Sequence, residues 1–157
     1  MTPLYIFDLD GTLSDNSHRV PLIHPDRKPT ADDWTRYTLR CSLDAPRQQV
    51  IMTLMSLYER GCDIRIWTGR DELARELTVA WLMCHCVRPR HVVEGWLEHM
   101  RENGDNTPGP NLKRKWLNLM SKEDRSRLVA VFEDQQKVVE MWRAEGITCF
   151  QLDSAEA

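Results

Sequence analysis

Three short runs, apolar or nearly so and each ending abruptly in polar residues, constrain the fold of this chain more than any other feature of its sequence. They occupy residues 4–7, 64–67 and 128–132, and apolar residues at helical spacing lie between them. A short apolar run that stops at a polar loop is typical of a buried strand. Strands that alternate with helices form a parallel sheet with helices on both faces. We therefore expect an α/β protein with a Rossmann-like core.

Four helices are expected between and after these strands. Asp44, Ala45 and Pro46 open the first, with a carboxylate as N-cap and proline in the first turn, and Gly61 ends it. The second follows Asp71 as its cap. The expected apolar stripes are, in chain order, Val50, Ile51, Leu54, Met55 and Tyr58; Leu73, Leu77, Ala80, Trp81 and Cys84; Leu112, Trp116, Leu117 and Met120; and Val138, Val139 and Trp142.

The remaining segments complete a single domain over residues 1–157. Further strands are predicted at 89–93 and 147–152, and residues 101–111 form a loop that holds two glycines and two prolines. Residues 13–43 are polar, contain three prolines and show little periodicity. A loop of this length is usually functional. We expect residues 13–43 to form a small flap, with no separate cap domain.

Composition narrows the possible functions. No apolar run approaches the roughly 20 residues needed to cross a bilayer, and the N-terminus lacks the features of a secretory signal. We therefore expect a cytoplasmic protein with no membrane contact. The net charge of −3 argues against a protein that coats long nucleic acid, although it leaves room for one that grasps a single end.

The cysteines do not indicate a metal or disulfide framework. There are five, spread without a regular spacing, which favours free thiols in a reducing compartment. Cys84, Cys86 and nearby His91 are spaced unlike the usual zinc ligands. Cys84 also belongs to the expected stripe of the second helix, so we expect it to pack in the core.

Polar side chains with related chemistry follow the predicted strands. In a parallel sheet the carboxyl ends of the strands meet at one edge, where ligands bind. The residues that we expect to gather there are Asp8 and Asp10 after the first strand, Thr68 after the second, Glu133 and Asp134 after the run at 128–132, and Lys113 near the start of the preceding helix.

This set suits phosphoryl transfer, which needs a nucleophile, a proton donor and neutralised phosphoryl oxygens. Asp8 can attack phosphorus while Asp10, two residues on, protonates the leaving oxygen. Two carboxylates would repel a phosphate unless a hard cation such as Mg²⁺ lies between them. We expect Asp8, the Asp10 carbonyl and Asp134 to hold Mg²⁺, and Thr68 and Lys113 to hold the non-bridging oxygens.

Several of these residues have simpler explanations. The Asp-x-Asp-Gly-Thr stretch could be a turn with side-chain hydrogen bonds, and Glu133 could cap the next helix or support the metal ligands. Lys113 is preferred over Lys115 because the buried stripe resumes three residues after it. Trp34 and Tyr37 are expected to pack within the flap rather than to stack on bases.

The four motifs resemble those of the haloacid dehalogenase superfamily: FDLDGT, the threonine of WTGR, a lysine, and an acidic pair after an apolar strand. A closer resemblance is to the 3′-phosphatase domain of phage polynucleotide kinase-phosphatases, carried by segment 133–151. An arginine after the first motif, an arginine after the second and an R-E-x-G-D stretch before the lysine also match. This resemblance implies substrate contacts by Arg19, Gly69, Arg70 and Arg101.

Three departures from that family stand out. The acidic pair reads Glu133-Asp134 followed by Gln135 instead of two aspartates and an arginine, and Gly109 replaces an acidic residue. No G-x-x-x-x-G-K-[ST] motif occurs, so we expect dephosphorylation without rephosphorylation.

The expected substrate is a 3′-phosphate at a DNA or RNA end, with no obligate protein partner. If a phage encodes the chain, the expected location is the cytoplasm of its bacterial host. A nucleotidase acting on free nucleoside monophosphates, or a catalytically idle module that binds phosphorylated ends, are the alternatives. The intact pair of Asp8 and Asp10 argues against the idle module, since mere binding needs no nucleophile.

Overall fold

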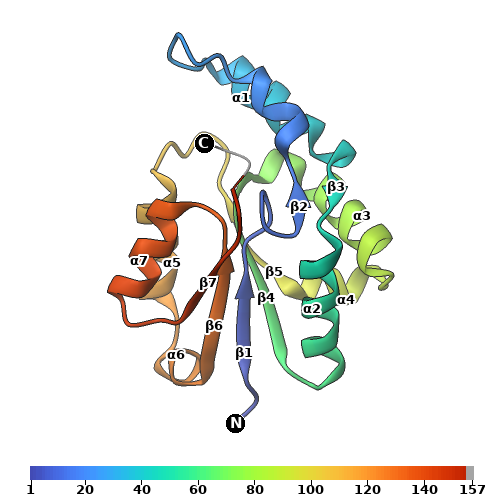
Figure 1. The fold of residues 1–157 in the computed structure, drawn as a ribbon, viewed down its shortest axis with the longest axis vertical. Coiled ribbons are helices and arrows are strands. Elements are labelled where there is room, and N and C mark those ends of the chain that lie inside the picture. Colours follow the sequence, from blue (N-terminus) through green and yellow to red (C-terminus); the bar gives the residue numbers. More distant parts are fainter. Residues whose placement is uncertain (155–157) are drawn as a thin grey trace.

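A five-stranded parallel sheet forms the centre of the computed structural model, which describes residues 1–154 (Figure 1). Neighbouring strands run parallel throughout, in the order β5-β4-β1-β6-β7. The strands are β1 (Leu4–Phe7), β4 (Asp63–Asp71), β5 (Leu97–Arg101), β6 (Leu128–Glu133) and β7 (Cys149–Gln151). The α/β class with a Rossmann-like sheet is thus confirmed.

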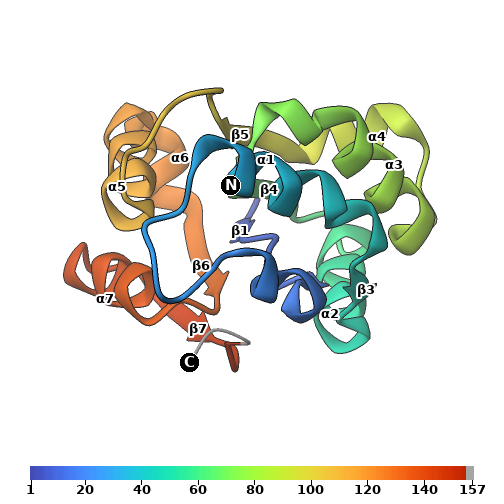
Figure 2. The same ribbon diagram turned by 90° about the horizontal axis from the view of Figure 1, so that it is seen from above.

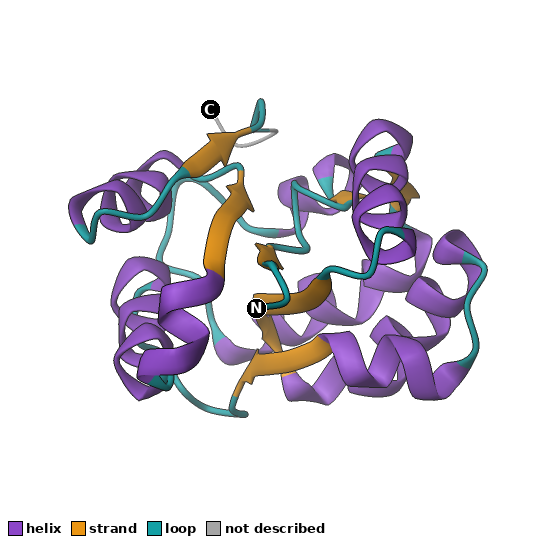
Figure 3. Ribbon diagram, turned by 90° about the horizontal axis from the view of Figure 1, so that it is seen from below, coloured by secondary structure: helices purple, strands orange, loops and turns teal. Residues whose placement is uncertain are grey.

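Helices cover both faces of the sheet (Figures 1 and 3). One layer contains α2 (Gln48–Glu59), α3 (Arg75–Cys86) and α4 (Arg90–Trp96), and the other contains α5 (Gly109–Leu119), α6 (Lys122–Arg127) and α7 (Gln136–Ala144). Adjacent residues of β1 pack into the hydrophobic cores on opposite faces of the sheet, because side chains alternate along a strand. Phe7 packs with the first layer and Ile6 with the second.

The flap stands above the carboxyl ends of the strands (Figures 1 and 2). It begins and ends in a short antiparallel pair, β2 (Ser14–Asp15) with β3 (Ala45–Pro46). Between them lie two 3₁₀ helices, η1 (Ser17–Leu22) and η2 (Arg40–Leu43), and helix α1 (Ala31–Leu39). The polar sequence of the flap concealed this helix. No separate cap domain is present within residues 1–154.

The prediction of a third strand at residues 89–93 is wrong, because these residues contain the start of α4. Two consecutive valines suggested a strand, but Arg90 and Glu94 pair one helical turn apart, and Val93 and Trp96 are buried on one side of the helix. The strand follows instead, as β5. It lies at the edge of the sheet and carries charged residues, which hid it in the sequence.

Two helix starts also differ from the prediction. Helix α2 begins at Gln48, so Asp44 is not its cap, and Ala45 and Pro46 lie in β3 instead. The capping turn after Asp71 is a 3₁₀ helix, η3 (Glu72–Ala74), and α3 follows it.

That extra turn shifts the buried side of α3. Leu73 and Cys84 are exposed, which corrects the expected stripe and the expected burial of Cys84. The buried side chains of α3 are Thr78, Val79, Trp81, Leu82 and Cys86. Within residues 1–154 no helix has the length and apolar character to pass through a membrane.

Candidate active site

The site lies at the carboxyl end of the central strand, where Asp8 follows β1 between β4 and β6. The backbone N–H of Asp8 donates to the carbonyl of Phe132, 3.0 Å away, which extends the pairing of β1 with β6 by one residue. The side chain of Asp8 is buried, and Thr12 Oγ1 donates to its Oδ2 at 3.3 Å. This contact of Thr12 was not predicted from the sequence.

Lys113 joins two carboxylates at the centre of the site. Its Nζ donates to Asp8 Oδ1 at 2.7 Å and to Glu133 Oε2 at 2.5 Å. Burial alone would lower the pKa of Lys113, but the charges of Asp8 and Glu133 outweigh it and raise that pKa. The ammonium therefore stays charged. Lys115 is exposed, and the structure places Lys113 against Asp8.

Asp134 sits against the loop that follows β1. A Cβ added to Gly11 would lie only 2.1 Å from Asp134 Oδ2, and Gly11 has a φ of +81°. Glycine is thus required here both for the close approach and for the left-handed backbone. Ser154 Oγ donates to Oδ2 of Asp134 at 3.2 Å. Oδ1 of Asp134 is buried and has no hydrogen-bond partner within residues 1–154.

These acidic groups fit a divalent cation. Asp8, Glu133 and Asp134 can each offer an oxygen within 4.8 Å of the others. Burial, with the charge of Glu133, raises the pKa of Asp8 well above its ordinary value and that of Asp134 to about 7. A hard cation that prefers oxygen ligands would offset this crowding and give the unpaired Oδ1 of Asp134 a partner. The residues present therefore fit Mg²⁺. The side chain of Asp10 lies outside this acidic group.

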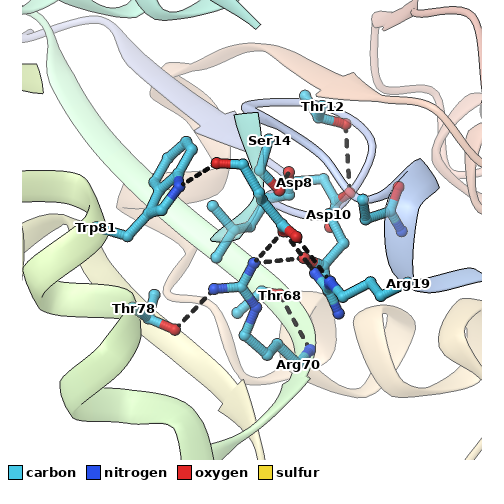
Figure 4. Close-up of polar contacts among 12 residues, drawn as sticks. Asp8, Asp10, Thr12, Ser14, Arg19, Thr68, Arg70, Thr78 and Trp81 are labelled. Atoms are coloured by element: carbon cyan, nitrogen blue, oxygen red, sulfur yellow. Dashed lines mark hydrogen bonds and ion pairs between the residues drawn. The ribbon is translucent and has the colours of Figure 1, made fainter. Parts of the chain in front are cut away.

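Asp10 is bound instead by two arginines (Figure 4). Arg19 Nη2 and Arg70 Nη2 both donate to Asp10 Oδ1 at 2.5 Å. Burial would raise the pKa of Asp10, but the charges of Arg70 and Arg19 outweigh it and lower the pKa. An ionised Asp10 is ready to accept a proton. To donate one it must first be protonated, which the negative charge of a bound phosphate would favour.

Asp44 holds the two arginines in place, and the sequence analysis missed it. Its Oδ1 accepts from Arg19 Nε at 2.8 Å, and its Oδ2 accepts from Arg19 Nη2 at 2.7 Å and Arg70 Nη2 at 3.4 Å. The carbonyl of Asp44 accepts from Trp81 Nε1 at 2.8 Å. All three charged side chains are buried. Two arginines expected at one buried site need an acidic residue to balance their charge. This requirement could have pointed to an additional carboxylate such as that of Asp44.

The last residues of β4 and the end of β5 carry the other predicted site residues. Thr68 is buried, and its Oγ1 accepts from the backbone N–H of Arg70 at 3.0 Å. Arg101 Nε donates to the carbonyl of Gly69 at 2.9 Å, and its Nη1 donates to two carbonyls of the following loop. In this arrangement Arg101 fixes backbone at the edge of the site. Its contact with substrate, like those of Gly69 and the other arginines, stays a prediction.

Arg47, like Thr12 and Asp44, has a contact at the site that the sequence did not predict. Its Nη1 donates to the carbonyl of Gly11, in the loop that carries Asp10, and to the carbonyl of Asp153 at 2.8 Å. The segment that leads from β7 to Ser154 is thereby held beside Asp134.

The family model for the phosphatase domain of polynucleotide kinase PNKP matches residues 2–156. No curated protein is similar enough in sequence to count as a match. Among solved structures, one chain of the Pnkp1/Rnl/Hen1 complex is 23% identical with a TM-score of 0.67 over 99% of this chain and 48% of that one. A second, from a structure described as the Pnkp1/Rnl/Hen1 RNA repair complex, is 23% identical with a TM-score of 0.65 over 99% and 44%. The class C acid phosphatase from Bacillus anthracis is 17% identical with a TM-score of 0.64 over 98% and 66%.

The chain thus spans about half the length of the two matching chains from these complexes, and these likenesses concern the fold. The family match is of a different kind, because it covers nearly the whole sequence, including every motif residue. Together with the buried nucleophile-like carboxylate, its lysine and the acidic group, it establishes a phosphatase of the haloacid dehalogenase type. The chain belongs to the family of the polynucleotide kinase PNKP phosphatase domain.

Proposed function

We propose that this phosphatase is a Mg²⁺-dependent phosphomonoesterase that forms an aspartyl-phosphate on Asp8 and removes 3′-phosphates from DNA or RNA ends. One observation supports the chemistry above all others. Asp8 is buried at a strand end, bonded to the Lys113 ammonium and grouped with an Asp134 oxygen that has no partner within residues 1–154. A merely structural carboxylate would not need such surroundings.

The proposed reaction has two steps. Asp8 attacks phosphorus, the bond to the 3′-oxygen breaks, and Asp10 gives that oxygen a proton. A water then attacks the phosphoaspartate while Asp10 takes up its proton, which releases inorganic phosphate and restores Asp8. Thr68 and Lys113 are proposed to hold the non-bridging oxygens.

The proposed metal ligands are the Asp8 and Asp134 carboxylates and the Asp10 carbonyl. Bound there, Mg²⁺ would supply charge neutralisation for the phosphoryl oxygens. Glu133 is proposed to act through Lys113, whose ammonium it holds at 2.5 Å. That contact leaves Asp134 as the more direct ligand.

A polymer end is favoured as substrate for three reasons. The family is that of a polynucleotide kinase phosphatase domain, and a chain of similar fold belongs to a complex described as an RNA repair complex. The insertion after β1 is a small flap rather than an enclosing lid. Arg19 and Arg70 donate to Asp10, and Arg101 donates to the carbonyl of Gly69 where β4 and β5 end. We propose that a substrate's phosphates pass along these groups.

A substrate panel tests the proposal. It compares 3′-phosphorylated oligonucleotides, 5′-phosphorylated oligonucleotides, free 3′-mononucleotides and p-nitrophenyl phosphate, each with Mg²⁺ and with EDTA. We expect the 3′-phosphorylated oligonucleotide to give the highest kcat/KM, EDTA to stop turnover, and Asp8→Asn to abolish it in a folded protein. Equal turnover of mononucleotides would favour the nucleotidase, and binding of phosphorylated ends without turnover of any substrate would favour the idle module.

A further inference from the structure

Helix α1 of the flap is held in one position by buried polar contacts. Thr30 and Asp33 form a reciprocal capping box at its start. Asp33 is buried and also accepts from Arg27 Nη1 at 2.6 Å and Arg36 Nη2 at 2.8 Å. These bonds tie the preceding loop and the helix together. The side chains that α1 presents are therefore fixed relative to the flap.

A chain of three contacts runs from α1 to the catalytic loop. The ring of Trp34 lies 5.8 Å from that of Tyr37, centroid to centroid. Arg19 lies over the Tyr37 ring at 4.4 Å, and Arg19 Nη2 donates to Asp10. Asn16 Nδ2 adds a hydrogen bond of 2.8 Å to the Tyr37 hydroxyl. Trp34 is thus anchored, through Tyr37 and Arg19, to the residue proposed to protonate the leaving oxygen.

The indole of Trp34 is nevertheless only partly covered. It is 49% exposed, and its plane meets that of Tyr37 at 86°, so the two rings do not stack face to face. Within residues 1–154 no other aromatic ring lies against it. An isolated exposed apolar side chain is ordinary. An exposed indole on the flap helix, linked to Asp10 through Tyr37 and Arg19, offers a flat surface on the flap.

We propose that Trp34 is the stacking platform for the nucleobase of the nucleotide that carries the phosphate. This inference rests on the proposed function, which places that nucleotide's phosphate at Asp8. Bases stack on aromatic side chains regardless of their sequence, so such a platform suits an enzyme that acts on ends of any sequence. The flap also carries Lys28 and Arg40, whose side chains form no ion pair within residues 1–154 and complement a nucleic-acid backbone.

The experiment compares substrates that differ only in the terminal base. The substrates are a 3′-phosphorylated oligonucleotide, the same oligonucleotide with an abasic terminal nucleotide, and acetyl phosphate, which has no ring. In the wild-type enzyme, removal of the base should lower kcat/KM by about fivefold or more, the effect of one stacked base. Trp34→Ala should cause a similar loss on the intact oligonucleotide and leave the abasic oligonucleotide and acetyl phosphate unchanged. Trp34→Phe, which keeps an aromatic face, should restore most of the activity.

Two controls separate stacking from damage. Leu119→Ala removes another exposed apolar side chain, at the end of α5, and should leave kcat/KM unchanged for all three substrates. A 2-aminopurine at the 3′-terminal position should be quenched when bound to Asp8→Asn, and this quenching should disappear in the Asp8→Asn, Trp34→Ala double variant.

The outcomes distinguish the two proposals. If the oligonucleotide is a good substrate but neither the base nor Trp34 matters, the platform is refuted and the 3′-phosphatase stands. If acetyl phosphate alone is hydrolysed, the proposed substrate class fails and the platform fails with it. Equal losses on all three substrates in Trp34→Ala would show a structural role and would also refute the platform.

Discussion

At the scale of single residues, the two carboxylates of the first motif have opposite surroundings. Asp8 lies among other acidic groups in a buried site, and its pKa is raised, first by burial and then by Glu133. Asp10 lies between two guanidinium groups, which lower its pKa despite burial. One residue, Leu9, separates them, and its side chain is buried in the core.

The raised pKa of Asp8 predicts a pH dependence that responds to Mg²⁺. Only ionised Asp8 attacks phosphorus, so kcat/KM should rise with pH through the pKa of this carboxyl. A bound cation favours the ionised form and lowers that pKa. Measured at increasing Mg²⁺, the acid limb of the pH profile should move to lower pH. An acid limb that stays fixed would place the metal away from Asp8.

Gly11 provides a test of the metal site that changes none of the proposed ligand residues. Gly11→Ala puts a Cβ where Asp134 Oδ2 now lies, so the carboxylate must move and the Mg²⁺ requirement should rise steeply. Gly61→Ala is the matched control, because Gly61 has a similar φ of +84° and a Cβ added there would meet no atom of residues 1–154 within 4 Å. Gly61→Ala should lower the free energy of unfolding only by the backbone strain, about 1–2 kcal/mol. Mg²⁺ titration of activity and urea unfolding of both variants decide between these effects.

We predict that removing the charge of Asp44 strongly lowers the free energy of unfolding. Asp44→Asn removes the carboxylate that faces the buried guanidinium groups of Arg19 and Arg70. Loss of one partner from a buried ion pair costs about 3–5 kcal/mol. Urea unfolding should show this loss. Glu94→Gln, which breaks an exposed pair with Arg90, should cost less than about 1 kcal/mol. Equal costs for the two variants would contradict this account.

The sequence was informative about the site where short motifs carry the chemistry. Asp8, Lys113 and Asp134 each follow or precede a strand in a recognisable pattern, and the structure has them together, although their catalytic roles stay predictions. Asp44 could not be placed in this way. Its role depends on two arginines that come near it only in the folded chain, and its position before Pro46 resembled a helix cap.

At the scale of elements, the pattern of apolar residues predicted the buried strands but not the half-polar strand β5. Strand β1 is buried on both sides and reads as a continuous apolar run, whereas β5 reads Leu-Glu-His-Met-Arg. Glu98 of β5 is satisfied by Arg65 and by Trp67 Nε1 at 2.7 Å, contacts that no local pattern reveals. Tertiary pairing of charges therefore hid this strand.

The flap helix predicts a local change in dynamics. Thr30→Ala removes the side-chain oxygen that accepts from the N–H of Asp33 and should destabilise α1 by about 0.5–2 kcal/mol. Hydrogen exchange of the amides at 31–39 should quicken by the corresponding factor while β1 stays protected. Thr53→Ala is the control, since Thr53 is exposed in α2 and its hydroxyl bonds to the carbonyl of Gln49 within the same helix. Unchanged exchange in α1 would mean that tertiary contacts alone hold this helix.

At the scale of the whole molecule, overall charge and local charge act in opposite directions. The chain carries a net charge of −3, yet guanidinium groups surround the proposed path of the substrate. We therefore expect the preference for an oligonucleotide over a 3′-mononucleotide to decline as salt rises, because phosphate contacts release counterions. A plot of the log of the ratio of the two kcat/KM values against log salt should have a negative slope. A flat plot would show that the polymer gains nothing from its additional phosphates.

The place of β1 in the sheet also has a consequence for how the chain is made. Among the strands of this sheet, β1 is made first, but its partners lie far along the chain. Leu4 of β1 pairs with Asp63 of β4 and with Leu128 of β6. Contacts so distant in sequence form slowly, and the nascent chain exposes its unpaired strands meanwhile. Asp8 and Asp134 come together only when β6 is in place. Phosphatase activity should therefore appear late in synthesis and in refolding, so that recovered turnover reports completion of the sheet.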